Sequence, residues 1–262
     1  MKGPAKRASE LVSIARFDHL LTLKRCGGYY ECPISPEGKL LGPLVGYAGK
    51  YEAPDKTKKQ WVGMIYANFA KAEEYPHVLY WFAQQMIKPK KIGAAILGLT
   101  DVFCGAPLGG YDFAKMLGLV LDRRAIKAEK KVTAFATADM REQSTMTFAR
   151  HEIKPGDRVT IVEDVCNNFS TTDQLIQLIE QAGGSVTAIT CLLNRSLTVD
   201  SIYTPPRKIV SLPVISLVRL PIAEFKQEDS AVADDIVRGN VVLKPKDEWG
   251  RLMAAMDKEE KQ

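Results

Sequence analysis

The stretch Thr160–Ile176, TIVEDVCNNFSTTDQLI, passes from an apolar run through a short polar segment into an amphipathic run. The apolar run, Val159–Val165, predicts a buried strand, and Thr172–Ala182 predicts a helix. Glu163 and Asp164 stand at the end of that strand, which is the edge where open α/β sheets bind ligands. Two adjacent carboxylates at this edge suit the paired hydroxyls of a ribose.

The polar segment between strand and helix is rich in amide and hydroxyl donors. Its backbone N–H groups and the helix N-terminus together predict an anion site, to which the side-chain hydroxyls would add donors. The simpler alternative is that the carboxylates only end a strand and the hydroxyls only cap a helix. The candidate phosphate ligands are Asn167, Asn168, Phe169, Ser170 and Thr171.

A second turn, made of small residues, is also expected between a strand and a helix. It follows an apolar run at Ile92–Leu99, expected to be a strand, and precedes a helix expected over Asp112–Lys127. Backbone amides in such a turn can approach a pyrophosphate closely, although glycine-rich turns are also ordinary connectors. The candidate residues are Ala106, Pro107, Leu108, Gly109 and Gly110.

Apolar strand-like runs that alternate with helical patterns indicate an α/β fold with a central parallel sheet flanked by helices. The expected segments are 1–88 for an N-terminal helix and a lid, 89–200 for the α/β core, and 201–262 for a C-terminal strand, lid or dimer-face segment and last helix. The expected strands are Ile92–Leu99, Val132–Ala138, Val159–Val165 and Val186–Leu193. Further helices are expected over Ser9–Leu23, Lys58–Ala72 and Pro76–Met86 and from about Asp247.

Composition narrows the class of protein. The chain has 262 residues, 46% of them hydrophobic, and a formal charge of +5, which suits an anionic small substrate. No apolar run is long enough for a membrane span, and the start resembles no secretory signal, so a cytoplasmic location is expected. Five cysteines without a C-x-x-C pair favour buried thiols. The sequence has no patch of interleaved basic and aromatic residues, so nucleic-acid binding is not expected.

The order of these motifs resembles the type I phosphoribosyltransferases, and most closely orotate phosphoribosyltransferase. The resemblance covers about Leu23 to Leu193. LKRCGGYYECPIS (Leu23–Ser35) resembles the family's N-terminal segment, FCGAPLGGYDFA (Phe103–Ala114) its pyrophosphate loop, and VTIVEDVCNNFST (Val159–Thr171) its signature for 5-phosphoribosyl-1-pyrophosphate (PRPP).

The resemblance implies transfer of 5-phosphoribosyl from PRPP to a nucleobase, with orotate as the expected base, by a Mg²⁺-dependent homodimer. Glu163 and Asp164 would bind the ribose diol and its metal, with Asp164 also as a catalytic residue, and Asn167–Thr171 would bind the 5-phosphate. Ala106–Gly110 would bind the pyrophosphate. Lys39 and Tyr29 in the lid would cover the base. The alternatives are a PRPP- or nucleotide-binding regulator without catalysis and a transferase for another base.

Two departures from the family pattern stand out. Phe169 occupies the place where the PRPP signature normally has glycine, so either the loop takes another conformation or PRPP binding is weakened. The family's mobile Arg-Lys-Glu-x-Lys loop is matched only in part, within Ala138–His151, where Arg141 is the candidate catalytic cation. Arg123–Lys127 has better basic spacing but is expected at a helix end. His151 is a candidate acid or base, or a surface histidine.

Overall fold

The computed structural model describes residues 19–88, 92–134, 143–206 and 210–259. The chain forms two compact units. The core unit contains Glu73–Pro221 and the N-terminal segment up to His19, whereas the terminal unit contains Leu20–Ala72 and Ile222–Gln262. The range 89–200, in which the α/β core is expected, lies within the core unit.

A six-stranded sheet forms the centre of the core unit, in the order β11-β12-β10-β9-β5-β6. All neighbouring pairs are parallel except β11 with β12, so the predicted α/β class with a parallel sheet is confirmed. The strands are β5 (Val102–Gly105), β6 (Arg124–Lys127), β9 (Arg158–Cys166), β10 (Ser185–Asn194), β11 (Ile202–Tyr203) and β12 (Leu212–Arg219).

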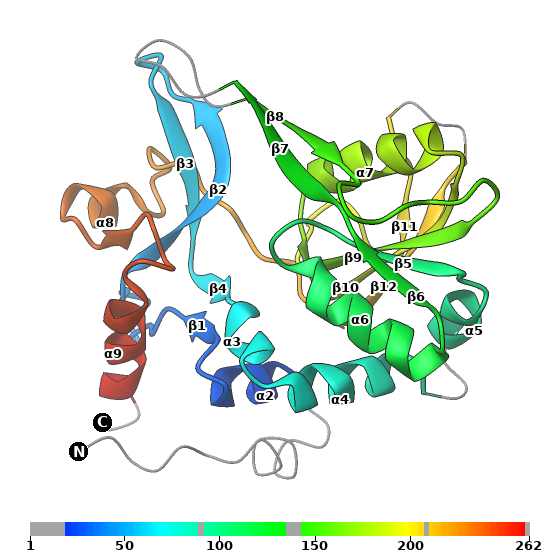
Figure 1. The fold of residues 1–262 in the computed structure, drawn as a ribbon. Helices are drawn as coiled ribbons and strands as arrows, with labels where there is room; N and C mark the ends of the chain where they lie inside the picture. Colours follow the sequence, from blue (N-terminus) through cyan, green and yellow to red (C-terminus); the bar gives the residue numbers. More distant parts are fainter. Residues whose placement is uncertain (1–18, 89–91, 135–142, 207–209, 260–262) are drawn as a thin grey trace. The chain divides into compact units, whose positions relative to one another are not determined.

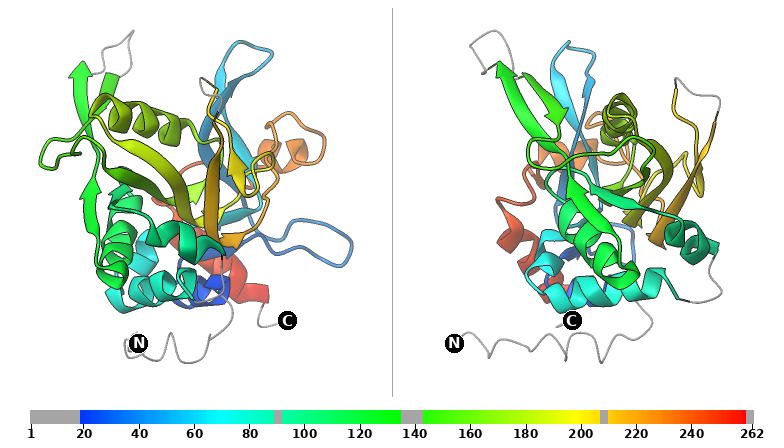
Figure 2. Two further views of the ribbon diagram at one scale, coloured as in Figure 1. Left: turned by 90° about the vertical axis from the view of Figure 1, so that its right-hand side faces the viewer. Right: turned by 45° about the vertical axis from the view of Figure 1, so that its right-hand side comes forward.

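Helices cover both faces of this sheet. Figures 1 and 2 show α7 on one face and α6 with α4 on the other. In α7 the buried residues Thr172, Leu175, Ile176 and Ile179 recur at helical spacing, which gives the helix one apolar side to pack on the sheet. The helices of the core unit are α4 (Pro76–Met86), α5 (Ile92–Gly98), α6 (Gly110–Leu121) and α7 (Ser170–Gln181).

The prediction of a strand over Ile92–Leu99 is wrong, because this run forms α5. A short apolar run cannot be assigned to strand or helix by periodicity alone, and adjacent alanines favour the helix. The first strand is instead β5, whose four residues are all buried. The strands predicted over Val159–Val165 and Val186–Leu193 are confirmed as β9 and β10.

The helix predicted over Asp112–Lys127 is too long. It ends at Leu121, where Asp122 takes a left-handed backbone conformation as the C-cap, and Arg124–Lys127 then forms the edge strand β6. The Val132–Ala138 prediction also needs correction. Described residues of this run belong to β7 (Glu129–Ala134), which pairs antiparallel with β8 (Gln143–Thr147) outside the parallel sheet.

The terminal unit combines segments from both ends of the chain. Its three-stranded sheet has the order β13-β2-β3, in which β13 from the C-terminal segment runs parallel to β2. A second small sheet pairs β1 with β4. The strands are β1 (Tyr29–Glu31), β2 (Leu44–Glu52), β3 (Lys58–Gly63), β4 (Ile65–Ala67) and β13 (Val241–Val242), and the helices are α2 (His19–Arg25), α3 (Ala70–Glu73), α8 (Ala233–Val237) and α9 (Trp249–Glu259).

The flanking segments contain one helix that was wrongly predicted and two that are confirmed. The helix predicted over Lys58–Ala72 is wrong, since this stretch forms β3, β4 and the start of α3. The helices from Pro76 and from about Asp247 are confirmed as α4 and α9. The predicted N-terminal helix lies largely outside the described residues, and its described end belongs to α2. Within the described ranges, no helix is long and apolar enough to cross a membrane.

Candidate functional site

The predicted carboxylate pair stands at the end of β9, between β5 and β10 in the sheet. The backbone N–H of Ala106, the first residue after β5, donates a 2.8 Å hydrogen bond to the Val162 carbonyl. This bond fixes the small-residue turn against the end of β9. The two turns that the sequence singles out therefore lie at one edge of the sheet.

Contacts of Gly109 and Gly110 show how closely the turn approaches β9. A methyl group at Gly109 would lie 2.4 Å from the Asp164 carboxyl carbon, and one at Gly110 would lie 1.9 Å from the Val162 carbonyl oxygen. Only glycine fits these positions without displacing backbone or carboxylate. The Asp164 carboxylate thus lies directly against the turn after β5.

Phe169 adopts the backbone conformation that glycine favours, with φ +60° and ψ +13°. Such a conformation costs a bulky residue on the order of 1–3 kcal/mol unless its surroundings compensate. The residue is only 3% exposed and belongs to the buried apolar cluster that also contains Leu175 and Ile176. The sequence therefore departs from the family signature at Phe169, whereas the backbone keeps a glycine-like left-handed turn.

This turn presents the N-terminus of α7 as a donor site. Asn168 accepts a 3.2 Å hydrogen bond from the Ser170 N–H through its side-chain oxygen, and Ser170 itself is exposed. The next amides, at Thr171 and Thr172, have no partner within the helix because they belong to its first turn. A phosphate at this end would meet several N–H donors and the positive end of the helix dipole.

The two carboxylates differ in environment. Glu163 is buried, and burial together with the charge of Asp164 raises its pKa well above the ordinary value, while Lys130 opposes the shift. Asp164 is only partly buried, and its Oδ1 accepts a 2.8 Å bond from the Val165 N–H. Asp164 is therefore the more accessible carboxylate for a ribose.

We expect Glu163→Gln to stabilise the protein at pH 8 relative to the wild type. Because burial raises the pKa of Glu163, the fold prefers the protonated form, and stability is lost as the pH rises through that raised pKa. Glutamine remains neutral throughout. Thermal unfolding from pH 4 to pH 8 should give a melting-temperature difference that grows with pH. A constant difference would contradict the pKa shift.

Cations that the sequence analysis did not select line the turn after β5. A pocket of about 240 Å³ is bounded by Ala106–Leu108, Tyr111 and Lys127–Lys130. Lys127 forms an ion pair with Glu129 at 3.1 Å. Lys127 and Lys130 are therefore candidate pyrophosphate cations, and the charged run KAEKK that starts at Lys127 was the available signal. Arg141 lies outside the described residues.

Arg195 is a second residue that the sequence analysis missed. It follows the end of β10, its N–H donates a 2.9 Å hydrogen bond to the Cys166 carbonyl, and it is 7% exposed. Its backbone lies beside the strand that carries the carboxylates, which makes Arg195 a further candidate residue for the site. A basic residue directly after an apolar strand was the sequence signal.

The candidate base-binding residues belong to the terminal unit. Lys39 is exposed. Tyr29 is buried, and its hydroxyl donates a 3.3 Å hydrogen bond to Glu31. The role of both residues in covering a base stays a prediction.

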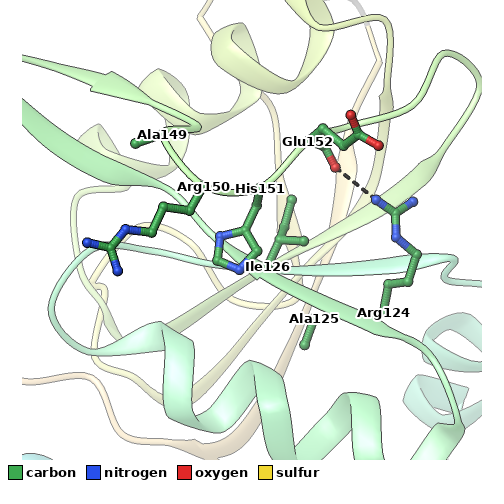
Figure 3. A pocket seen from close by; sticks show the side chains of 7 residues that line it. All are labelled: Arg124, Ala125, Ile126, Ala149, Arg150, His151 and Glu152. Atoms are coloured by element: carbon green, nitrogen blue, oxygen red, sulfur yellow. Dashed lines mark hydrogen bonds between the residues drawn. The ribbon is translucent and has the colours of Figure 1, made fainter.

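The alternative basic cluster forms part of the sheet edge. Arg124 bonds Asp157 at 2.9 Å and the Glu152 carbonyl at 2.8 Å, and Arg123 donates to the Thr100 carbonyl. An open groove of about 750 Å³ lies beside Arg124, Arg150 and His151. Figure 3 shows Arg124 and Arg150 extending to opposite sides of the His151 ring, so their charges do not converge on one point.

Comparison with known proteins gives related sequences but no matching family model. The orotate phosphoribosyltransferase of Heliobacterium modesticaldum is 34% identical over 101 residues, 38% of this chain and 47% of that protein. The orotate phosphoribosyltransferase of Caldanaerobacter subterraneus subsp. tengcongensis is 28% identical over 186 residues, which are 69% of this chain and 81% of that protein. The adenine phosphoribosyltransferase of Butyrivibrio fibrisolvens is 34% identical over 100 residues, which are 36% of this chain and 55% of that protein.

The match thus spans about half the length of two of these three relatives. Among solved structures, an orotate phosphoribosyltransferase from Aeropyrum pernix is 15% identical, with a TM-score of 0.49 over 76% of this chain and 91% of that chain.

Proposed function

We propose that this chain, which belongs to the type I phosphoribosyltransferase family, transfers a 5-phosphoribosyl group from PRPP to a ring nitrogen of a nucleobase. The contact between Asp164 and Gly109 carries the proposal. Through this contact the Asp164 carboxylate, suited to the ribose diol, lies between the turn after β5, suited to pyrophosphate, and the start of α7, suited to a monophosphate. PRPP carries its pyrophosphate, diol and 5-phosphate in an arrangement that matches these three parts.

Catalysis in this proposal rests on positioning and electrostatics. The bond from ribose C1 to the pyrophosphate oxygen breaks as the ring nitrogen of the base attacks C1, and the proton on that nitrogen passes to the departing pyrophosphate or to water. Asp164 holds the ribose hydroxyls, and its negative charge favours an oxocarbenium-like centre nearby. Lys127 and Lys130 stabilise the departing pyrophosphate, with Arg141 as a further cation.

We expect magnesium to bind together with PRPP. Within the described residues, no group of three or more His, Cys, Asp or Glu side chains is placed to hold an ion. Asp164, the more accessible carboxylate, suits an ion that takes its other ligands from PRPP oxygens and water, and Glu163 would join it only after losing its proton. When bound, Mg²⁺ supplies positive charge to the pyrophosphate.

Orotate is the proposed base, because two of the relatives are named as orotate phosphoribosyltransferases, and we propose that Arg195 binds its carboxylate. Orotate carries a carboxylate, and a buried guanidinium can bind a carboxylate through two hydrogen bonds. Adenine has no charge to match. The relatives named as adenine phosphoribosyltransferases keep adenine as the second candidate. The resemblance further implies a homodimer in the cytoplasm.

The test measures pyrophosphate release from PRPP and Mg²⁺ with a panel of bases that includes orotate and adenine. We expect release with orotate. Saturable PRPP binding without pyrophosphate release for any base would indicate a PRPP-binding regulator and not an enzyme. Release with adenine alone would show that adenine, and not orotate, is the substrate.

Arg195→Lys tests the choice of base. It keeps the charge but loses the planar pair of donors, so we expect KM for orotate to rise by about tenfold or more while KM for PRPP stays within about twofold. An unchanged KM for orotate would remove Arg195 from the base site. The melting temperature of the variant controls for folding.

A further inference from the structure

The residue under the phosphate turn is Tyr203, which lies in the edge strand β11 far along the chain from Phe169. The rings of Phe169 and Tyr203 are stacked, with centroids 4.5 Å apart and planes 16° from parallel. Both side chains are buried in the same apolar cluster. Tyr203 therefore fixes the side chain of the residue whose backbone makes the left-handed turn.

Two hydrogen bonds through Asp173 also connect Tyr203 to Phe169. The Tyr203 hydroxyl donates to Asp173 Oδ1 at 2.8 Å, and the Asp173 N–H donates to the Phe169 carbonyl at 2.9 Å. Burial and the bond to Asp173 raise the pKa of Tyr203, so the hydroxyl keeps its proton. Tyr203 is thus tied both to the ring of Phe169 and to the first turn of α7.

We propose that Tyr203 is a positioning residue for the 5-phosphate loop, which acts through Phe169 to hold the loop amides in the conformation that glycine would otherwise supply. The inference rests on the proposed PRPP site. Glycine reaches a positive φ without support, whereas phenylalanine needs its side chain to be held. The contact between the two stacked rings therefore stabilises a backbone conformation that glycine would adopt without help.

The test is a double-mutant cycle of Phe169→Gly and Tyr203→Leu. Leucine keeps much of the apolar volume but loses the stacking ring and the hydroxyl. Titration calorimetry measures the Kd for PRPP with Mg²⁺, and thermal unfolding is measured in parallel. In the wild-type background we expect Tyr203→Leu to weaken PRPP binding about tenfold, and in the Phe169→Gly background about threefold or less, which is the effect of losing the bond to Asp173 alone.

Two further probes separate positioning from general destabilisation. Ribose 5-phosphate should show the same coupling as PRPP, whereas inorganic pyrophosphate, which binds the turn after β5, should show none. Tyr203→Phe keeps the stacking ring and loses the bond to Asp173, so we expect roughly a threefold effect, which is near the free energy of one hydrogen bond. This variant keeps the test decisive if Tyr203→Leu does not fold.

Equal losses of PRPP affinity in both backgrounds, or a lower melting temperature with unchanged Kd, would overturn the role of Tyr203 and leave the proposed function standing. If the folded wild type binds no PRPP, the proposed function fails and the inference fails with it. Coupling that is confined to PRPP and ribose 5-phosphate would support both.

Discussion

Replacing Asp164 with asparagine is expected to weaken PRPP binding by about 100-fold or more. The carboxylate lies against Gly109 at the junction of the two turns, where the ribose diol would sit. Asparagine has nearly the same shape but loses the charge and one acceptor. Each hydrogen bond to a charged group contributes about 1.5–3 kcal/mol, so losing one such bond and weakening the other to a bond with a neutral oxygen accounts for the effect. Titration calorimetry with PRPP and Mg²⁺ measures it.

The matched control for this variant is Asp122→Asn. Asp122 caps α6 with a φ of +52°, a conformation that asparagine also adopts readily. We expect its PRPP affinity to stay within about twofold of the wild type, since Asp122 stands at the opposite end of α6 from Gly110 and the turn after β5. Binding by Asp164→Asn within twofold of the wild type would mean that the ribose lies elsewhere.

Replacing Gly110 with alanine is expected to destabilise the core unit by about 1–3 kcal/mol and to lower PRPP affinity about tenfold or more. The added methyl would lie 1.9 Å from the Val162 carbonyl oxygen. Val162 belongs to a central strand with hydrogen-bonded neighbours on both sides, so the turn must move instead. Thermal unfolding and PRPP titration measure the two effects.

Gly98→Ala is the control for added side-chain volume in the same unit. A methyl there would meet nothing within 4 Å. We expect its stability to stay within about 0.5 kcal/mol of the wild type or to rise slightly, because alanine favours the helix. Wild-type affinity in Gly110→Ala would show that the turn after β5 does not bind the pyrophosphate.

Sequence patterns predicted the central part of the fold well. The strand before Glu163 and the helix that follows Asn168 have strong signals, because a fully apolar run leads into a helix with one buried side. The carboxylates and the turn after β9 follow from those elements. The other turn was recognised by its small residues, although the strand predicted before it was wrong, and it meets the carboxylates because carboxyl ends of parallel strands lie at one edge. The contact between Asp164 and Gly109 is the consequence.

The errors arose where local signals are ambiguous. Ile92–Gly98 is apolar and short, so only tertiary packing decides that it is α5. Arg124–Lys127 has helix-compatible residues but forms the edge strand, since α6 stops at Asp122. Phe169 was ambiguous for another reason. Its positive φ depends on Tyr203, a residue that no local pattern connects to it.

Locating PRPP or ribose 5-phosphate with Mg²⁺ in a crystal structure of this protein tests the central claim most directly. The predicted result is a 5-phosphate at the amides of Asn168–Thr171, a ribose diol at Asp164 and Phe169 still in its left-handed conformation. Ligand in the groove beside Arg124 and Arg150, with the turn after β9 empty, would contradict the account.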